Sequence, residues 1–162
     1  MLFCIDIGNT NIVLGVTQKN QILYNWRIRT EKEVTPDELG ILVTNLFQSA
    51  GARLADIKDI IISCVVPPLL NTFEEFSRRY FKINPMVVNH DLNTGMPIHY
   101  DNPKEVGADR IVNAVGAYEK YHTALIAVDF GTATTFDYIS QEGVYMGGAI
   151  APGVIISCEA LF

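Results

Sequence analysis

A short turn occurs twice in this sequence, each time between two apolar segments. The first copy runs from Asp6 through Gly8 to Thr10, and the second runs from Asp129 through Gly131 to Thr134. A strand that ends in Asp, turns at Gly and restarts through small polar residues forms a tight hairpin whose mouth exposes backbone N–H groups and hydroxyls. Such a mouth suits a polyphosphate, and the Asp can hold a cation beside it. The pair therefore predicts a nucleotide gripped between two domains.

Either turn taken alone has a simpler explanation. Asp, Gly, Asn and Thr are the usual residues of hairpin turns, so each copy could be purely structural. The repetition favours the phosphate function, because unrelated turns rarely repeat the same pattern with matched strands on both sides.

Composition limits the classes of function that need to be considered. The chain has 162 residues, 49% of them hydrophobic, which is enough for a real core in one domain or two small ones. A net charge of −6 and a pI near 4.9 argue against general binding to nucleic acid or to an anionic membrane. The sequence has no signal peptide pattern and no apolar run long enough to span a membrane. We therefore expect a globular, soluble protein.

The three cysteines indicate a reducing compartment. Cys4, Cys64 and Cys158 each stand in an apolar run, without a CxxC pair or a metal-ligand spacing. This usage predicts buried, reduced thiols and a cytoplasmic location.

The first ninety residues predict strands and helices in the order βββαβα. The strands are expected at residues 2–7, 11–16 and 22–29, then at 59–66 and 86–89. Thr35 and Pro36 have the N-cap and first-turn character of a helix that ends at Gly51, and residues 68–81 have an amphipathic helical pattern.

The remainder repeats the strand-turn-strand pattern after a loop and a helix. A polar loop covers residues 90–106, a helix covers 107–121, and the second hairpin follows. We expect a first domain at residues 1–118 with the first phosphate loop, and the start of a second domain at 119–162.

Four ordered motifs together resemble one family, the type III pantothenate kinases, also grouped with the Bvg accessory factor proteins. The motifs cover residues 6–10, 107–110, 129–134 and 147–153. The resemblance implies an α/β fold of the actin, Hsp70 and sugar kinase superfamily, which is ribonuclease H-like. Family members generally continue well beyond Phe162, so we expect a complete first domain and a truncated second one. Such a fragment is expected to self-associate and to be inactive alone.

The resemblance implies ATP-dependent phosphorylation of pantothenate, the first step of coenzyme A synthesis. By similarity Asp109 is the general base, a role that suits a carboxylate because it is ionised at neutral pH. Without the resemblance, the residues favour an ordinary first-turn helix acid at this position. The resemblance also implies that Arg110 is a fixed cation for an anionic substrate or for the charge of the transition state. Its alternative is an arginine on the surface of a helix.

The resemblance also places the substrate. Gly107, Ala108, Asp109 and Arg110 together form its motif, and Tyr100 matches an aromatic residue that contacts pantothenate. The alternative for Tyr100 is a packing tyrosine. His99 has no partner at a diagnostic spacing and is expected to be a loop histidine.

For the nucleotide, the resemblance implies contacts along the first loop and at Thr132 of the second. Asp6 would position magnesium indirectly, and Asp129 would bind a monovalent cation, potassium or ammonium. Val13 would contact the nucleotide through its backbone or belong to the core. Asp137 could alternatively be a supporting or structural acid. Gly147 and Gly148 would let the backbone approach the substrate or a second subunit closely. The ATP-binding residues of the first loop are Asp6, Ile7, Gly8, Asn9, Thr10, Asn11, Ile12 and Val13.

The resemblance implies a homodimer whose protomers share catalytic residues. Two other classes of function stay open from the residues. A related sugar or acetate kinase would share both phosphate loops but lack the motif at residues 107–110. A non-catalytic regulatory protein would keep the fold without turnover.

Overall fold

The computed structural model describes residues 1–161, and the chain divides into two compact units, Met1–Val88 and Asn89–Phe162. The first unit contains five strands, two α-helices and two short helical turns. Its elements are β1 (Leu2–Ile7), β2 (Asn11–Gln18), β3 (Gln21–Arg29), α1 (Pro36–Ser49), η1 (Leu54–Asp56), β4 (Asp59–Cys64), α2 (Pro67–Phe76), η2 (Ser77–Phe81) and β5 (Met86–Val87).

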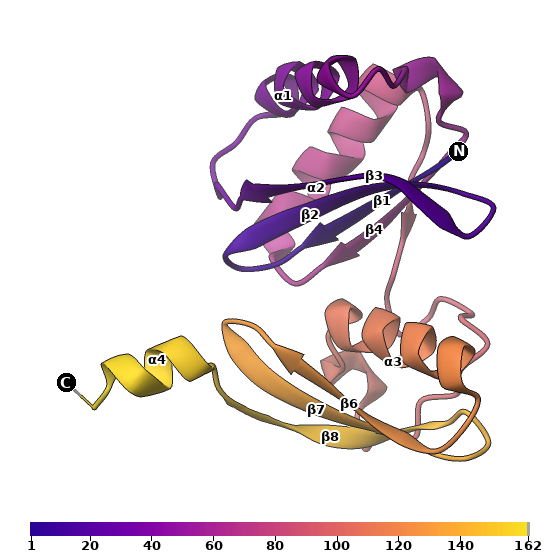
Figure 1. Ribbon diagram of the computed structural model, residues 1–162, viewed down its shortest axis with the longest axis vertical. Coiled ribbons are helices and arrows are strands. Elements are labelled where there is room, and N and C mark those ends of the chain that lie inside the picture. Colours follow the sequence, from indigo (N-terminus) through magenta and orange to yellow (C-terminus); the bar gives the residue numbers. More distant parts are fainter. Residues whose placement is uncertain (162) are drawn as a thin grey trace. The chain divides into compact units, whose positions relative to one another are not determined.

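These strands form one mixed sheet in the order β3-β2-β1-β4-β5. The strands β1, β2 and β3 pair antiparallel, while β4 runs parallel to both β1 and β5. Helices α1 and α2 pack on the same face of this sheet (Figure 1). The predicted βββαβα order is therefore confirmed for this unit.

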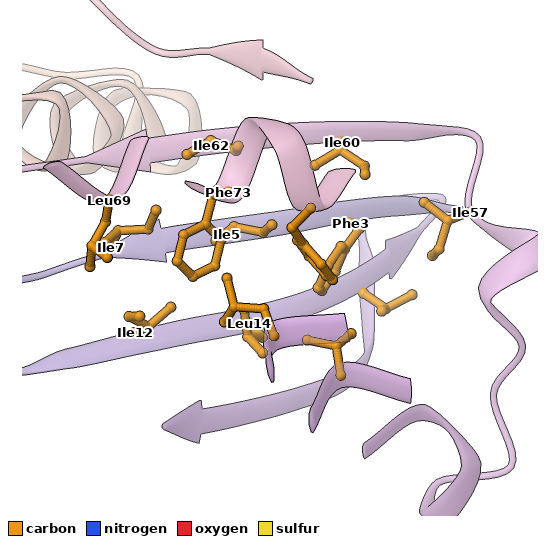
Figure 2. Close-up of a cluster of buried hydrophobic side chains, with 14 of the residues drawn as sticks. Phe3, Ile5, Ile7, Ile12, Leu14, Ile57, Ile60, Ile62, Leu69 and Phe73 are labelled. Carbon is orange, nitrogen blue, oxygen red and sulfur yellow. The ribbon is translucent and has the colours of Figure 1, made fainter. Parts of the chain in front are cut away.

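Alternation along the strands explains the core of the first unit. Phe3, Ile5 and Ile7 of β1 point to the helices and are buried, whereas Asp6 between them is exposed on the other face. They meet Leu69 and Phe73 of α2 in one apolar cluster (Figure 2). The strand that ends in the first loop is therefore anchored by its alternate residues.

The first helix begins as its sequence predicts. Thr35 is the N-cap: its hydroxyl accepts from the backbone N–H of Glu38, and the Glu38 carboxylate accepts from the N–H of Thr35. The second helix is shorter than expected, because α2 ends at Phe76 and the chain continues through a π-helical turn to Phe81. Lys82 then takes a left-handed backbone conformation that ends the segment.

The second unit is a three-stranded antiparallel sheet with a helix on one face. It contains η3 (Pro103–Glu105), α3 (Ala108–Tyr121), β6 (Leu125–Phe130), β7 (Ala133–Ile139), β8 (Tyr145–Pro152) and α4 (Val154–Glu159). The sheet order is β6-β7-β8, and α3 packs across β6 and β7 (Figure 1). Ile111 and Ala114 of α3 are buried there, with Ile139 and Tyr145 of the sheet.

The division of the chain differs from the expected boundary at residues 118 and 119. It falls between Val88 and Asn89, so the helix with the residue 107–110 motif belongs to the same unit as the second hairpin. The reason is packing: α3 contacts β6 and β7, and Ile111 and Ala114 of the helix are buried there.

The opposite face of the second sheet is apolar and exposed. Phe130 is 72% exposed, and Ile126, Val128, Phe136 and Tyr138 are also exposed. Helix α4 exposes Ile155 as well, and the expectation of a buried Cys158 is wrong, because no described element covers this helix.

Cys4 and Cys64 are half-buried, and all three cysteines are free thiols. None of the helices in the described part is long and apolar enough to cross a membrane.

Candidate functional site

The first predicted loop is a hairpin that connects β1 and β2. Ile7 pairs with Ile12 across it, and the Gly8 N–H donates to the Asn11 carbonyl at 3.1 Å. Thr30, which follows β3, fixes the loop from the side. Its hydroxyl donates to the Gly8 carbonyl at 2.7 Å, and its N–H donates to the Thr10 carbonyl at 3.1 Å. The loop is therefore held by a third strand, a contact that the sequence did not reveal.

Residues of this loop divide into two groups by exposure. The side chains of Ile7 and Ile12 are buried in the core, so these residues can meet a ligand only through their backbone. Val13 is half-buried and Gly8 is partly exposed. The exposed polar residues at the mouth are Asp6, Asn9, Thr10 and Asn11.

The second predicted loop is a tighter hairpin between β6 and β7. Phe130 pairs with Thr134, and the Gly131 N–H donates to the Ala133 carbonyl at 2.9 Å. The Gly153 N–H donates to the Thr132 carbonyl at 3.2 Å, which ties this loop to the start of α4. Both repeated turns are therefore hairpins, as predicted, although the second is one residue shorter.

Asp129, at the end of β6, is exposed and has a partner on α3. The side-chain amide of Asn113 donates to Asp129 Oδ2 at 3.1 Å. Asn113 lies one helical turn after Asp109, so the predicted cation carboxylate and the predicted base connect to the same helix. An open hollow of about 470 Å³ lies at this place, between α3 and the strands β6 and β7. It is lined by Asn113, Ala117, Tyr121, Ala127, Val128, Asp129 and Asp137.

The motif at residues 107–110 forms the beginning of α3. Gly107 is the N-cap, and the first helical bond runs from the Ile111 N–H to the Gly107 carbonyl at 3.1 Å. Asp109 is half-buried, and its Oδ1 accepts from the Arg110 N–H at 2.8 Å. This contact is that of a first-turn helix acid, which is compatible with a catalytic role because a carboxylate has further acceptor positions.

The alternative of a surface arginine is wrong for Arg110. The residue is 6% exposed, and its guanidinium pairs with Asp137 of β7, itself 1% exposed. Nε donates to Asp137 Oδ1 at 2.7 Å, and Nη2 lies 2.6 Å from the same oxygen. Asp137 is therefore the partner of a buried ion pair, in line with its alternative interpretation as a supporting acid.

Tyr145 of β8 completes this cluster. Its hydroxyl donates to Asp137 Oδ1 at 2.7 Å, and its ring centroid lies 5.9 Å from the Arg110 guanidinium. Burial, followed by the hydrogen bond to Asp137, raises the pKa of Tyr145 above its ordinary value. Burial alone would lower the pKa of Arg110, but the Asp137 carboxylate outweighs it and the net shift is upward. Arg110 thus stays charged and Tyr145 stays neutral.

The loop that carries Tyr100 is fastened to the same strand. The His99 N–H donates to the Tyr145 carbonyl at 2.8 Å, and the Tyr145 N–H donates to the Pro97 carbonyl at 2.9 Å. The Tyr100 ring lies over Gly147, whose φ of +120° and missing side chain leave room for it. The structure therefore brings Tyr100 and the residue 107–110 motif to one strand of the second unit.

The acids of the described residues do not form a preassembled metal centre. Among residues 1–161 no group of three or more His, Cys, Asp or Glu side chains could hold a metal ion. Asp6 and Asp129 are each an exposed carboxylate beside a loop, and they suit a cation that takes its other ligands from backbone, water or phosphate oxygens.

Comparison with known sequences decides the family. The sequence model described as "Type III pantothenate kinase" matches residues 2–162. The chain belongs to the type III pantothenate kinase family. Curated relatives with the same name are 61% identical in Syntrophobacter fumaroxidans and 62% identical in Geotalea uraniireducens, over all 162 residues of this chain. The chain spans 63% of the length of these two type III pantothenate kinases.

Solved structures support the fold of this type III pantothenate kinase chain at low identity. A Ppx/GppA phosphatase from Aquifex aeolicus aligns over 99% of this chain and 55% of its own, with 16% identity and a TM-score of 0.57. A Baf family protein from Campylobacter jejuni aligns over 98% of this chain and 58% of its own, with 16% identity and a TM-score of 0.53. The chain therefore has the mixed α/β fold of these two structures, and the predicted α/β class is confirmed.

Three further residues contact predicted site residues, each within its own unit, but were not singled out by the sequence. Asn113 has a weak signal, since it stands four positions after Asp109 and hence on the same helix face. Thr30 and Tyr145 have no local signal, because their roles depend on contacts between strands, whereas the close approach at Gly148 was expected from the sequence.

Proposed function

We propose that the protein phosphorylates pantothenate with ATP, the first step of coenzyme A synthesis. The observation that supports this most is the family match over residues 2–162, together with the Tyr100 loop and Arg110 of the motif contacting the neighbouring strands β8 and β7. The chain spans 63% of the length of its relatives, so the activity is proposed for the full-length protein, meaning this sequence with any chain that follows it naturally.

In the proposed reaction the primary hydroxyl of pantothenate attacks the γ-phosphorus of ATP. A phosphorus–oxygen bond forms, the bond to the ADP oxygen breaks, and the hydroxyl proton passes to the Asp109 carboxylate. Asp109 stands at the N-terminal turn of α3, half-buried and oriented by the Arg110 N–H. Tyr100, Gly107, Ala108 and Arg110 form the proposed substrate subsite around it.

The ATP phosphates are proposed to lie on the two hairpin loops. The first loop offers backbone from residues 6–13 and the exposed side chains of Asn9, Thr10 and Asn11. Thr132 offers a contact in the second loop. Backbone N–H groups at such loops neutralise phosphate charge without a basic surface, which agrees with the acidic composition.

Two cations belong to the proposal. Magnesium is held at Asp6 through water, and a monovalent cation, potassium or ammonium, is held at Asp129. Both acids are exposed at their loops, and a carboxylate beside a polyphosphate is repulsive unless a cation intervenes. The cations would supply charge neutralisation during phosphoryl transfer.

We also propose a homodimer in the cytoplasm, without nucleic acid or membrane partners. The exposed apolar face of the second sheet, with Phe130 and Ile126, supports burial by further protein. The three free thiols agree with a reducing compartment.

A coupled kinase assay on the full-length protein tests the proposed function. ADP release should require pantothenate and rise with potassium, and acetate and sugars should give no turnover. Turnover on a sugar or acetate would favour a related kinase. No binding of ATP or pantothenate by isothermal titration would favour a non-catalytic protein.

A further inference from the structure

We propose that Asp137 and Tyr145 are positioning residues that hold Arg110, and through it Asp109, at the start of α3. This inference rests on the proposed function, because it assigns a purpose to the geometry around the proposed base. Asp137 and Tyr145 do not touch the proposed reacting atoms in this account. They act by fixing the first helical turn against the sheet.

The hydrogen bonds of this cluster converge on one oxygen. Asp137 Oδ1 accepts from Arg110 Nε at 2.7 Å and from the Tyr145 hydroxyl at 2.7 Å. All three residues are buried, and bonds to a buried charge are strong and strict in geometry. The guanidinium therefore has one defined place relative to β7 and β8.

The backbone of β8 at Gly148 lies close against this cluster. A Cβ at Gly148 would collide with the Phe136 carbonyl and with Arg110 Nη2, and it would lie 2.9 Å from Asp137 Oδ1. Strand β8 therefore lies directly against the ion pair. A side chain at this position would displace the guanidinium from the carboxylate.

The same strand also fixes the proposed substrate tyrosine. The backbone of Tyr145 exchanges two hydrogen bonds with the loop at Pro97 and His99, next to Tyr100. The side chain of Tyr145 meanwhile reaches Asp137. One residue thus couples the Tyr100 loop to the helix turn that carries Asp109.

The charge balance favours positioning over substrate attraction. The side chain of Arg110 is 8% exposed and that of Asp137 is 1% exposed, and their charges cancel. A cation that is buried and neutralised in this way attracts an anionic substrate weakly. The guanidinium of Arg110, held against β7, instead fixes the position of the Arg110 backbone. The N–H of that backbone in turn orients the Asp109 carboxylate.

The test compares Tyr145→Phe with the control Tyr118→Phe in the full-length protein. Tyr118 is a matched control because its hydroxyl also donates one hydrogen bond, to the Gln141 carbonyl at 3.1 Å, in the same unit. Small displacements of catalytic groups cost up to about 100-fold in rate, so we expect Tyr145→Phe to lose roughly tenfold in kcat. KM for ATP should stay within about twofold, whereas Tyr118→Phe should keep wild-type kcat.

A double variant separates positioning from general stabilisation. If Tyr145 acts through Asp109, Tyr145→Phe should have no further effect on the residual kcat of Asp109→Asn. Asp137→Asn tests the same network at its carboxylate. If Asp137→Asn does not fold, the result for Tyr145→Phe alone decides between positioning and general stabilisation. A full tenfold loss in both backgrounds, or wild-type kcat in a folded Tyr145→Phe protein, would overturn the proposal.

Amide hydrogen exchange provides a readout that does not depend on turnover. The Ile111 N–H closes the first turn by its bond to Gly107, so its exchange should accelerate in Tyr145→Phe and not in Tyr118→Phe. Absence of pantothenate phosphorylation by the wild-type protein would refute the proposed function. The amide exchange rate of Ile111 would then be the measurement that decides whether the network holds the first turn of α3. Unchanged exchange would overturn the positioning network.

Discussion

Asn113 of α3 donates a hydrogen bond from its side-chain amide to Oδ2 of Asp129 at 3.1 Å. The bond joins the helix of the proposed base to the acid that precedes the second loop. It orients the Asp129 carboxylate on one side and leaves its other oxygen at the exposed end of β6. The proposed potassium activation of the full-length protein should therefore depend on both residues.

Removing this carboxylate is expected to remove the cation effect. Asp129→Ala should abolish potassium activation and raise KM for ATP, because the phosphates lose an intervening positive charge. Asn113→Ala should only raise the potassium concentration for half-activation, by a few-fold. Rates measured across a potassium titration check this, with Glu119→Ala on the same helix as the control. An unchanged potassium response in Asp129→Ala would place the ion elsewhere.

The hydrogen bonds from Thr30 to the first loop predict a specific effect on the KM for ATP. Thr30→Val keeps the shape and the backbone bond to Thr10 but loses the hydroxyl bond to Gly8. A net hydrogen bond contributes about 1 kcal/mol, so KM for ATP should rise about fivefold. Ser49→Ala is the control, since it deletes a hydroxyl bond to a backbone carbonyl of α1. An equal effect on the KM for pantothenate would argue against a local role.

Two glycines of the second unit are expected to respond in opposite directions to alanine. Gly148→Ala places a Cβ against the Arg110–Asp137 pair and should lower the free energy of unfolding by about 2 kcal/mol or more. Gly116→Ala, inside α3, meets nothing within 4 Å and should raise it by up to about 1 kcal/mol. Urea unfolding of the two variants measures both changes. Equal stability of the two would contradict the close fit at Gly148.

The raised pKa of Tyr145 predicts a loss of stability at high pH. Above the ordinary pKa of 10.0 the unfolded tyrosine loses its proton while the buried one keeps it. The free energy of unfolding should then fall with pH, by at most about 1.4 kcal/mol per unit from this group. Below pH 10 the contribution is fully present. Unfolding midpoints between pH 9 and 12 should decline less steeply in Tyr145→Phe than in the wild-type chain, and Tyr121→Phe, at an exposed site, serves as control.

Local patterns in the sequence predicted most of the elements. The first strand agrees from Leu2 to Ile7, and Thr35 caps α1 because its capping signal is complete within four residues. The end of α2 at Phe76 was missed, since a π-helical turn continues the same apolar pattern. The boundary after Val88 was missed because the apolar face of α3 fits either sheet as judged from sequence alone.

Only part of the candidate site could be predicted from the sequence, because the rest depends on contacts between distant residues. Loop residues such as Gly8 and Gly131 have a local turn signature, and both form hairpins. The pairing of Arg110 with Asp137 joins residues 27 positions apart, on a helix and a strand. The pair forms only because the fold buries both partners side by side and their mutual hydrogen bonding offsets the desolvation cost, which no local pattern encodes.

The central claim is that Asp109 accepts the proton of the pantothenate hydroxyl. The most direct measurement is kcat for pantothenate in full-length Asp109→Asn, with folding checked by thermal unfolding. Asparagine keeps an oxygen that can accept from the Arg110 N–H, so the helix turn should survive. We predict a loss of about 10²–10⁴-fold in kcat with a normal fold, whereas Asp101→Asn in the exposed loop should stay near wild type. Near wild-type kcat in a folded Asp109→Asn enzyme would contradict the account.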